Sequence, residues 1–163
     1  MTGTVLVTGG TGYIGGEVID QLLVKGYAVH TTVRNAAKSE PRLRERWPDA
    51  GDRLKVFQAD LMSDEGWAEA NTRCRAVAHV ASPFPLAVPK HKDELVVPAR
   101  EGTLRALRFA KDAGVKRFVQ TSSAAAIAYG YPDRDHFDHT DWTNLNAGVT
   151  PDIESKTLAE AAA

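Results

Sequence analysis

Three glycines near the start of the chain stand at three-residue intervals, within the segment TGGTGYIG at residues 8–15. The segment follows a short β-branched run and leads into a helix-like pattern, the context in which such a triplet binds a pyrophosphate. Gly9 permits the tight turn, Gly12 lets the backbone approach the phosphates, and Gly15 lets helix and strand pack closely. An ordinary glycine-rich turn is the alternative. The predicted dinucleotide contacts come from Gly9, Thr11, Gly12, Tyr13, Ile14 and Gly15.

A cation stands where an NAD site usually has an acid. About 20 residues after the glycine loop, an Asp or Glu would accept hydrogen bonds from the ribose hydroxyls. Here the second β-branched run ends at Val33 and Arg34, and no acid appears before Glu40. Arg34, assisted by Lys38, is suited to hold a 2′-phosphate through charge-assisted hydrogen bonds. The alternative is a solvated basic stretch, which we prefer for Arg42, Arg44 and Arg46. The pattern therefore predicts NADP(H) as the cofactor.

Two further segments are candidates for cofactor contact because each follows a strand-like run. Asp60 and Leu61 follow the third run, where a carboxylate could accept the adenine amino group; Asp60 is equally suited to cap a helix. After the fourth run, small residues would let the backbone touch the cofactor, and the contacts expected there are Val80, Ala81 and Ser82. The preceding residue, His79, is interpreted as a core histidine with a satisfied hydrogen bond.

These segments need a sheet that brings their strand ends together. Short apolar runs alternate with amphipathic stretches, which is typical of a parallel sheet covered on both faces. The expected strands lie at 5–7, 28–33, 54–58, 76–80 and 117–120. Helical spacing is clearest at Val18, Ile19, Leu22 and Leu23, at 93–113 and at 152–163. The sequence predicts an α/β fold of Rossmann type, a doubly wound sheet of about five parallel strands in the order 3-2-1-4-5.

The composition narrows the class of protein. The chain has 163 residues, 43% of them hydrophobic, and a formal net charge of −1. No field of one sign favours nucleic acid or a membrane surface, and no apolar run approaches the roughly 20 residues of a membrane span. We expect a cytoplasmic protein with one NADP-binding domain over residues 1–163 and a long loop at 129–151. The loop carries His136 and His139, but we expect a solvated cluster and no metal site.

Taken together, the motifs resemble the extended short-chain dehydrogenase/reductase family of the NAD-dependent epimerase/dehydratase superfamily. The resemblance is strongest to its dihydroflavonol and cinnamoyl-CoA reductase-like branch, which reduces aldehydes and ketones with NADPH. The matching segments are 5–15, 33–34, 59–61, 79–83, 102–103, 118–123 and 155–160. Members of that family are considerably longer, so the resemblance implies an N-terminal half that ends before the substrate region. It also implies that a sixth strand covers the edge of the fifth.

The resemblance further implies hydride chemistry that uses a serine, a tyrosine and a lysine, the last two in a Tyr-x-x-x-Lys pattern. Ser123 matches the serine that hydrogen-bonds the substrate carbonyl, with Ser122 as the alternative register. Judged by its position alone, Ser123 would be a strand-end residue that satisfies backbone groups. Lys156 matches the lysine that holds the nicotinamide ribose. Asp152 stands where the tyrosine is expected, and an ionised aspartate cannot donate a proton to an alkoxide.

Three functions follow as expectations. The first is an NADPH-dependent reductase that acts on a small-molecule aldehyde or ketone, impaired in this chain by Asp152 and by the absent substrate region. The second is a non-catalytic NADP(H)-binding or regulatory module, which Asp152 favours. The third and weaker one is an NAD-dependent sugar epimerase or dehydratase, against which Arg34 argues. We also expect self-association through the open sheet edge, and no nucleic-acid or membrane partner.

Overall fold

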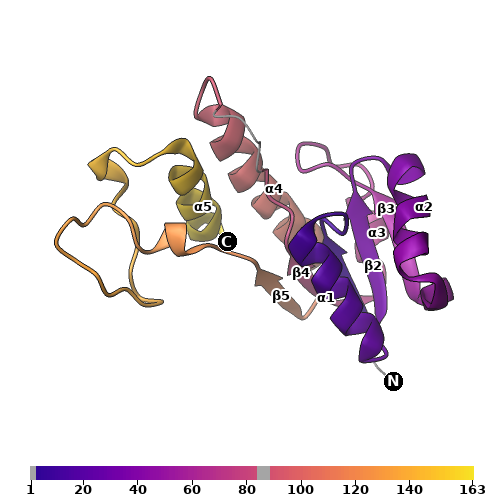
Figure 1. Cartoon of the computed structure of the whole chain (residues 1–163). Coiled ribbons are helices and arrows are strands. Elements are labelled where there is room, and N and C mark those ends of the chain that lie inside the picture. The colour runs from indigo at the N-terminus through magenta and orange to yellow at the C-terminus, as the bar shows by residue number, and fades with distance from the viewer. Residues whose placement is uncertain (1–2, 84–88) are drawn as a thin grey trace. The chain divides into compact units, whose positions relative to one another are not determined.

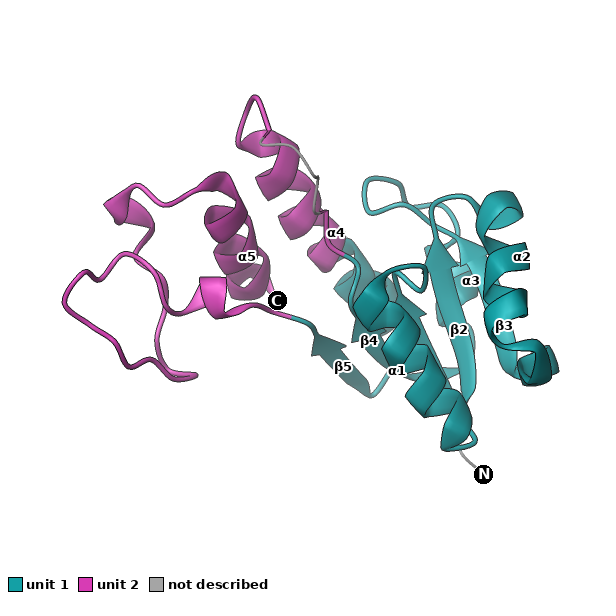
Figure 2. Cartoon of the chain, viewed as in Figure 1, with its two compact units in different colours: residues 1–81, 105–121 teal, residues 82–104, 122–163 magenta. Residues whose placement is uncertain are grey.

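The computed structural model describes residues 3–83 and 89–163, which form two compact units (Figure 2). The first unit comprises residues 1–81 and 105–121, and the second comprises residues 82–104 and 122–163. Each unit is described by itself below. The expectation of one cofactor-binding domain over the whole chain stays a prediction.

The first unit is built on a parallel sheet of five strands in the order β3-β2-β1-β4-β5, as predicted. The strands are β1 (Thr4–Thr8), β2 (Ala28–Val33), β3 (Leu54–Gln58), β4 (Cys74–His79) and β5 (Arg117–Gln120), and Figure 1 labels the last four of them. The β1–β2 ladder runs to the pair Thr8 and Thr32, whereas the β1–β4 ladder ends one residue earlier, at Val7 and Ala78. Strands β1 and β4 therefore stop pairing one residue before the end of β1.

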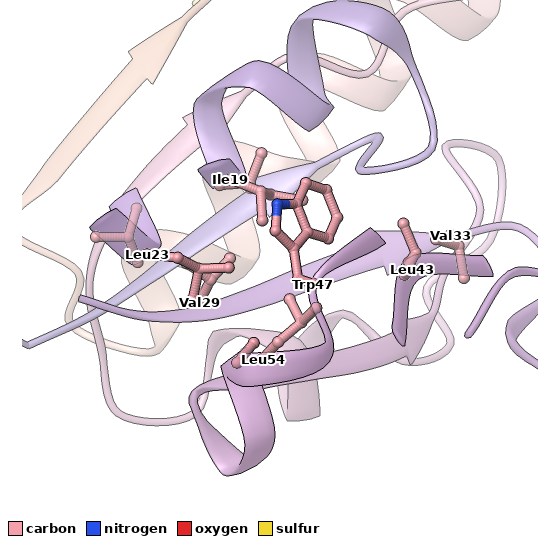
Figure 3. Close-up of a cluster of buried hydrophobic side chains, with 10 residues drawn as sticks. Ile19, Leu23, Val29, Val33, Leu43, Trp47 and Leu54 are labelled. Atoms are coloured by element: carbon pink, nitrogen blue, oxygen red, sulfur yellow. The ribbon is translucent and has the colours of Figure 1, made fainter. Parts of the chain in front are cut away.

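One face of the sheet is covered by α1 (Tyr13–Val24) and α2 (Ala36–Arg46). Figure 3 shows Trp47 among apolar side chains from α1, α2 and the sheet, including Ile19 and Leu54. The indole of Trp47 is buried, and its Nε1 donates to Asp20 Oδ1 at 3.2 Å. Burial of such side chains stabilises the fold by roughly 1.5–3 kcal/mol each.

The other face is covered by α3 (Trp67–Asn71) and by the part of α4 (Asp93–Asp112) that belongs to the first unit. Strand alternation divides the core: Val5 and Val7 pack toward α1, whereas Leu6 packs with Val77 and Ala110. Since helices cover both faces, the sheet is doubly wound.

Helix α2 was not expected from the sequence. It contains Pro41 and a high proportion of charged residues, and only Leu43 is buried, so it carries no apolar stripe to signal a helix. The Asn35 side chain caps it by accepting from Lys38 N at 2.9 Å. A 3-10 segment, η1 (Pro48–Arg53), then leads into β3.

The second unit holds the start of α4, the 3-10 turns η2 (Ala124–Ala126) and η3 (Leu145–Ala147), and α5 (Pro151–Ala162). Apart from η3, residues 129–150 form no helix or strand, in agreement with the long loop expected there. Helix α5 begins at Pro151, one residue before the predicted start, because proline fits the first helical position. Across the described ranges 3–83 and 89–163, no helix is long and apolar enough to cross a membrane.

Candidate functional site

The glycine loop connects β1 to α1 in the first unit. Gly9 has a φ of +74°, a left-handed conformation that favours glycine, and a Cβ there would lie 3.1 Å from Ala81 Cα. A Cβ on Gly15 would lie 2.3 Å from the carbonyl oxygen of Gly9. The close approach at Gly15 is thus to the loop itself, whereas the expectation had been close packing of helix and strand.

The N-terminus of α1 is open to an anion. Gly12 is the N-cap residue, no side chain caps the helix, and the first turn holds no acid. Thr11, Gly12, Tyr13 and Ile14 are exposed, Tyr13 to 84%. Because the first N–H groups of a helix lack intrahelical partners and carry the positive end of its dipole, this end can bind a phosphate.

Arg34 directly follows β2 and is exposed. Within the described part of the chain, the side chains of Arg34 and Lys38 take part in no hydrogen bond or ion pair. Two of the later arginines are engaged instead: Arg44 pairs with Glu40 at 3.1 Å and Arg46 with Glu17 at 2.8 Å. Arg34 and Lys38 therefore keep their charge available for a ligand.

Asp60 stands in a tight turn between β3 and α3. Its Oδ1 accepts from Met62 N at 2.8 Å, while the Trp67 indole donates to the Asp60 carbonyl at 3.0 Å. The helix-capping alternative for Asp60 is wrong, since α3 begins only at Trp67 and is preceded by Gly66 as its N-cap. The side chain of Leu61 is half-buried against the core cluster around Trp67, and its cofactor contact stays a prediction.

The segment after β4 is held by the side chain of Thr8. The Thr8 hydroxyl oxygen accepts from Val80 N at 3.0 Å and from Ala81 N at 2.9 Å, and it lies 2.9 Å from His79 Nδ1. Burial lowers the pKa of the His79 imidazole to about 4. His79 is a core histidine as expected, but the role of Thr8 was missed. The available signal was a polar residue at the end of an apolar strand, directly before the first glycine.

In the second unit, Ser123 follows β5 and caps η2. Its Oγ accepts from Ala125 N at 3.1 Å, which satisfies a backbone group and leaves the hydroxyl proton free to donate. Ser122, the alternative register, instead donates its hydroxyl proton to Glu160 Oε2 on α5. The hydroxyl proton of Ser122 is therefore engaged by a carboxylate, whereas that of Ser123 is not.

Two buried threonines hold the Ser123 turn against its neighbours. Thr143 Oγ1 donates to the Ala125 carbonyl at 2.7 Å, and Thr157 Oγ1 on α5 approaches the same oxygen at 3.3 Å. Their positions in the loop and on α5 gave no sequence signal, because isolated threonines are common in both contexts. They tie together the loop, the turn and α5.

Lys156 projects from α5 and donates from Nζ to Ser82 Oγ at 2.9 Å. Burial lowers the pKa of Lys156, and the charge of Asp152 partly opposes that effect. Asp152 lies one turn earlier, in the first turn of α5. The second unit thus brings Ser82 and Lys156 together, which the sequence did not indicate.

No group of three or more potential metal-ligating side chains occurs in the described ranges. The single cysteine, Cys74, is buried; its Sγ donates to the Ala70 carbonyl at 3.3 Å, and burial raises the pKa of its thiol to about 11. Cys74 is therefore a packing residue and has no chemistry to contribute to either unit.

Comparison with known proteins gives a consistent family. Residues 5–161 match the NAD dependent epimerase/dehydratase family. The chain is 36% identical over 169 residues to vestitone reductase of Medicago sativa, covering 98% of this chain and 52% of that protein. It is 37% identical over 148 residues to dihydroflavonol 4-reductase of Hordeum vulgare, and the match covers 88% of this chain and 41% of that protein.

Solved structures agree with this assignment. The alfalfa vestitone reductase structure matches with a TM-score of 0.83 at 33% identity, covering 99% of this chain and 51% of that one. The structure of the yeast methylglyoxal/isovaleraldehyde reductase Gre2 in complex with NADPH also matches with a TM-score of 0.83, at 26% identity. This match covers 98% of this chain and 51% of that one. The chain spans about half the length of the relatives it matches.

Proposed function

Because the chain belongs to the NAD dependent epimerase/dehydratase family, we propose that it binds NADP(H) and serves an NADPH-dependent reductase of short-chain type. The proposed substrate is a small-molecule aldehyde or ketone. The observation that carries the proposal is the open N-terminus of α1 behind the glycine loop, with the unengaged charge of Arg34 at the end of β2. The NADPH complex of Gre2 gives independent support for the choice of cofactor.

The residues of the first unit fit a dinucleotide phosphate. The loop from Gly9 to Gly15 has no room for additional side chains at its ends, so a pyrophosphate would be held by backbone N–H groups. Arg34 and Lys38 would hold the 2′-phosphate. The Asp60 carboxylate keeps one oxygen, Oδ2, beyond the bond to Met62, and this oxygen could accept the adenine amino group.

NADPH, when bound, supplies the hydride. In the second unit, Ser123 would donate its free hydroxyl proton to the substrate carbonyl and polarise it. The Lys156 ammonium, already bonded to Ser82, would bind ribose hydroxyls. Asp152 supplies no proton in its ionised form, and its charge opposes the negative charge that grows on the carbonyl oxygen. We propose that reduction by this chain is slow for that reason.

A second candidate function is non-catalytic binding of NADP(H), and Asp152 is the observation that favours it. The epimerase or dehydratase alternative is weaker, because Arg34 suits the 2′-phosphate that NAD lacks. A cytoplasmic location and the absence of nucleic-acid and membrane partners remain proposals. They rest on the net charge of −1 and the near balance of basic and acidic residues.

Two measurements on one sample test the proposal. Binding is followed by the fluorescence of NADPH during titration, and turnover by NADPH oxidation with a panel of aldehydes and ketones. Binding with slow oxidation of at least one carbonyl supports the reductase. Binding with no oxidation beyond the rate without protein favours the non-catalytic module. A chain that binds no NADPH overturns both.

A further inference from the structure

A groove opens in the first unit at the amino ends of strands β1 and β2, whereas the glycine loop follows the carboxyl end of β1. Thr4 and Ala28, the first residues of β1 and β2, line the groove together with Phe57 of β3. Its volume of about 540 Å³ is within the range of sites that hold small organic molecules. The residues that line it include none of those proposed for the cofactor.

His30 of β2 is the buried polar side chain of this groove and is 9% exposed. Its Nδ1 lies 2.8 Å from the Ala70 carbonyl oxygen, which can only accept, so Nδ1 carries a proton. The other ring nitrogen, Nε2, has no hydrogen-bond partner in the described part of the chain. In the same ranges, the unpartnered side-chain atoms sealed from solvent belong to Asn71 and Gln120, so Nε2 stays accessible. His30 therefore offers the groove an open nitrogen.

The charged side chains around the groove leave one positive charge in excess. Three cations and two acids line it: Arg53, Lys55, Arg73, Asp52 and Glu69. Arg53 donates from Nη1 to the Leu23 carbonyl at 2.9 Å. The side chains of Lys55 and Arg73 take part in no hydrogen bond or ion pair within residues 3–83 and 89–163. The lining thus matches a ligand with a single negative charge, and two cations are available to hold it.

The backbone at Arg73 supports a role for this side chain in binding. Arg73 has a φ of +58°, and among the described residues it is the one non-glycine residue with a positive φ. Glycine adopts this conformation without strain, whereas arginine does so at a cost. Strained residues of this kind are concentrated at ligand-binding sites. The guanidinium that the strain retains beside the groove is well suited to bind a carboxylate.

We infer that this groove is a second binding site, separate from the proposed cofactor site, for a small organic anion that carries one carboxylate on an apolar body. The carboxylate would lie among Lys55, Arg73 and His30. The apolar body would lie against Phe57, whose ring centroid is 4.8 Å from that of His30. The inference does not depend on the binding of NADP(H).

Binding of the carboxylate is coupled to the uptake of a proton by His30. Burial lowers the pKa of its imidazole, the bond to the Ala70 carbonyl opposes this effect, and the charge of Lys55 adds to it. A bound carboxylate favours the imidazolium, which takes a proton from water onto Nε2 and donates it to a carboxylate oxygen. The other charged groups of the lining are Asp52, Arg53, Glu69 and Arg73. The Cys74 thiol lies 3.5 Å from Nδ1, and burial raises its pKa to about 11, so it does not titrate near neutral pH.

The first test is an NMR titration of the amide signals with benzoate. The dissociation constant should be on the order of 1 mM, as for a ligand of this size. The amides of Ala28, Lys55 and Arg73 should shift, and those of the glycine loop at 9–15 should not. Benzyl alcohol has the same ring without the charge and should cause no shifts at the same concentration. The affinity for benzoate should rise about fivefold as the pH falls from about 8 to about 6.

Two charge-removing variants separate the groove from the general charge of the protein. Arg73→Gly should weaken benzoate binding about fivefold and keep or raise the thermal stability, because glycine relieves the strain at this φ. Lys111→Ala is the matched control, since Lys111 is an exposed cation of α4 that does not line the groove. It should change the affinity by less than about twofold. His30→Gln should abolish the pH dependence, which Arg73→Gly should retain.

Equal weakening by Arg73→Gly and Lys111→Ala would overturn the inference, as would the absence of benzoate binding or equal binding of benzyl alcohol. Affinity that does not change with pH would overturn the role of His30. Inorganic phosphate that binds more tightly than benzoate would overturn the assignment to a carboxylate. Saturating NADP⁺ should leave the affinity for benzoate unchanged, and competition between the two would overturn the separate site. A chain that binds benzoate and no NADP⁺ would overturn the proposed function alone.

Discussion

The two units depend on their side chains to very different degrees. In the first, the proposed phosphate contacts are backbone N–H groups, and side chains matter mainly by their absence at Gly9 and Gly15. In the second, the proposed chemistry needs individual functional groups on Ser123, Lys156 and the residue at 152. A backbone site survives most substitutions around it. A side-chain site is lost when one group changes, even where the fold does not change.

Helix α5 illustrates this difference. Asp152 sits in the first turn after Pro151, where a carboxylate interacts favourably with the helix dipole. The helix therefore tolerates aspartate where the resemblance expects tyrosine. We expect the difference to affect proton donation to the substrate and not the stability of the helix. The contrast predicts a chain that is competent in binding and deficient in turnover.

The largest expected effect comes from restoring the proton donor. Asp152→Tyr should raise the rate of carbonyl reduction by about 10²-fold, the low end of the range for positioned proton transfer. The measurement is NADPH oxidation at saturating NADPH with the most reactive aldehyde of the panel.

Asp152→Asn is the control for charge. It removes the repulsion of the growing negative charge but adds no acidic proton, so it should recover much less than Asp152→Tyr. If the asparagine variant were as fast as the tyrosine variant, repulsion rather than proton donation would limit the rate.

The next effect tests the cofactor preference of the first unit. Arg34→Asp should change the ratio of NADPH to NADH affinity by at least about tenfold and reverse it, because a carboxylate repels the 2′-phosphate and accepts from ribose hydroxyls. Arg42→Asp makes the same charge change at another exposed position and should leave the ratio unaltered. Calorimetric titration of each variant with NADPH and with NADH measures this ratio. The same ratio in the two variants would show that Arg34 does not bind the 2′-phosphate.

A third effect concerns the stability of the first unit against pH. Burial lowers the pKa of His79 to about 4, so the unfolded chain binds more protons than the folded one between about pH 6.5 and 4. The free energy of unfolding should fall by about 3 kcal/mol as the pH drops through this window and be unaffected by His79 above it. Urea unfolding at several pH values measures the slope, and His79→Gln should flatten it. An unchanged slope in that variant would exclude His79 as the source.

The smallest effect concerns association. Among the described strands, β5 pairs only with β4, and Val119 on it is 57% exposed. We propose that two copies meet at this edge at high micromolar concentration, and that Val119→Lys weakens the contact because edge lysines oppose strand pairing. Light scattering measures the mass of both proteins. A monomer at every concentration would refute the proposed contact.

The sequence predicted the first unit better than the second. Glycines, β-branched runs and the helix stripe of α1 are local signals, and together they gave the five parallel strands and their order. Helix α2 was not predicted from the sequence, because most of its residues are charged and a proline lies inside it. The sequence could not show whether Asp60 caps a helix, because that depends on where the following helix begins.

The contacts that were missed join residues far apart in the chain. Thr8 reaches Val80 and Ala81, and Lys156 reaches Ser82 across 74 positions. A single threonine or serine carries no periodic or spacing signal, so only the folded topology could bring these partners together. The roles of Ser123 and Lys156 stay predictions that rest on the family resemblance, and the position of Ser123 alone would suggest a strand-end residue that satisfies backbone groups.

The central claim is that the first unit is built for NADP(H). Calorimetric titration of the unmodified chain with NADPH and with NADH, in the same buffer, tests it most directly. The account predicts a dissociation constant for NADPH at least about tenfold lower than that for NADH, because Arg34 offers a charge that only the 2′-phosphate can use. Equal affinities, or no binding of NADPH, would contradict it.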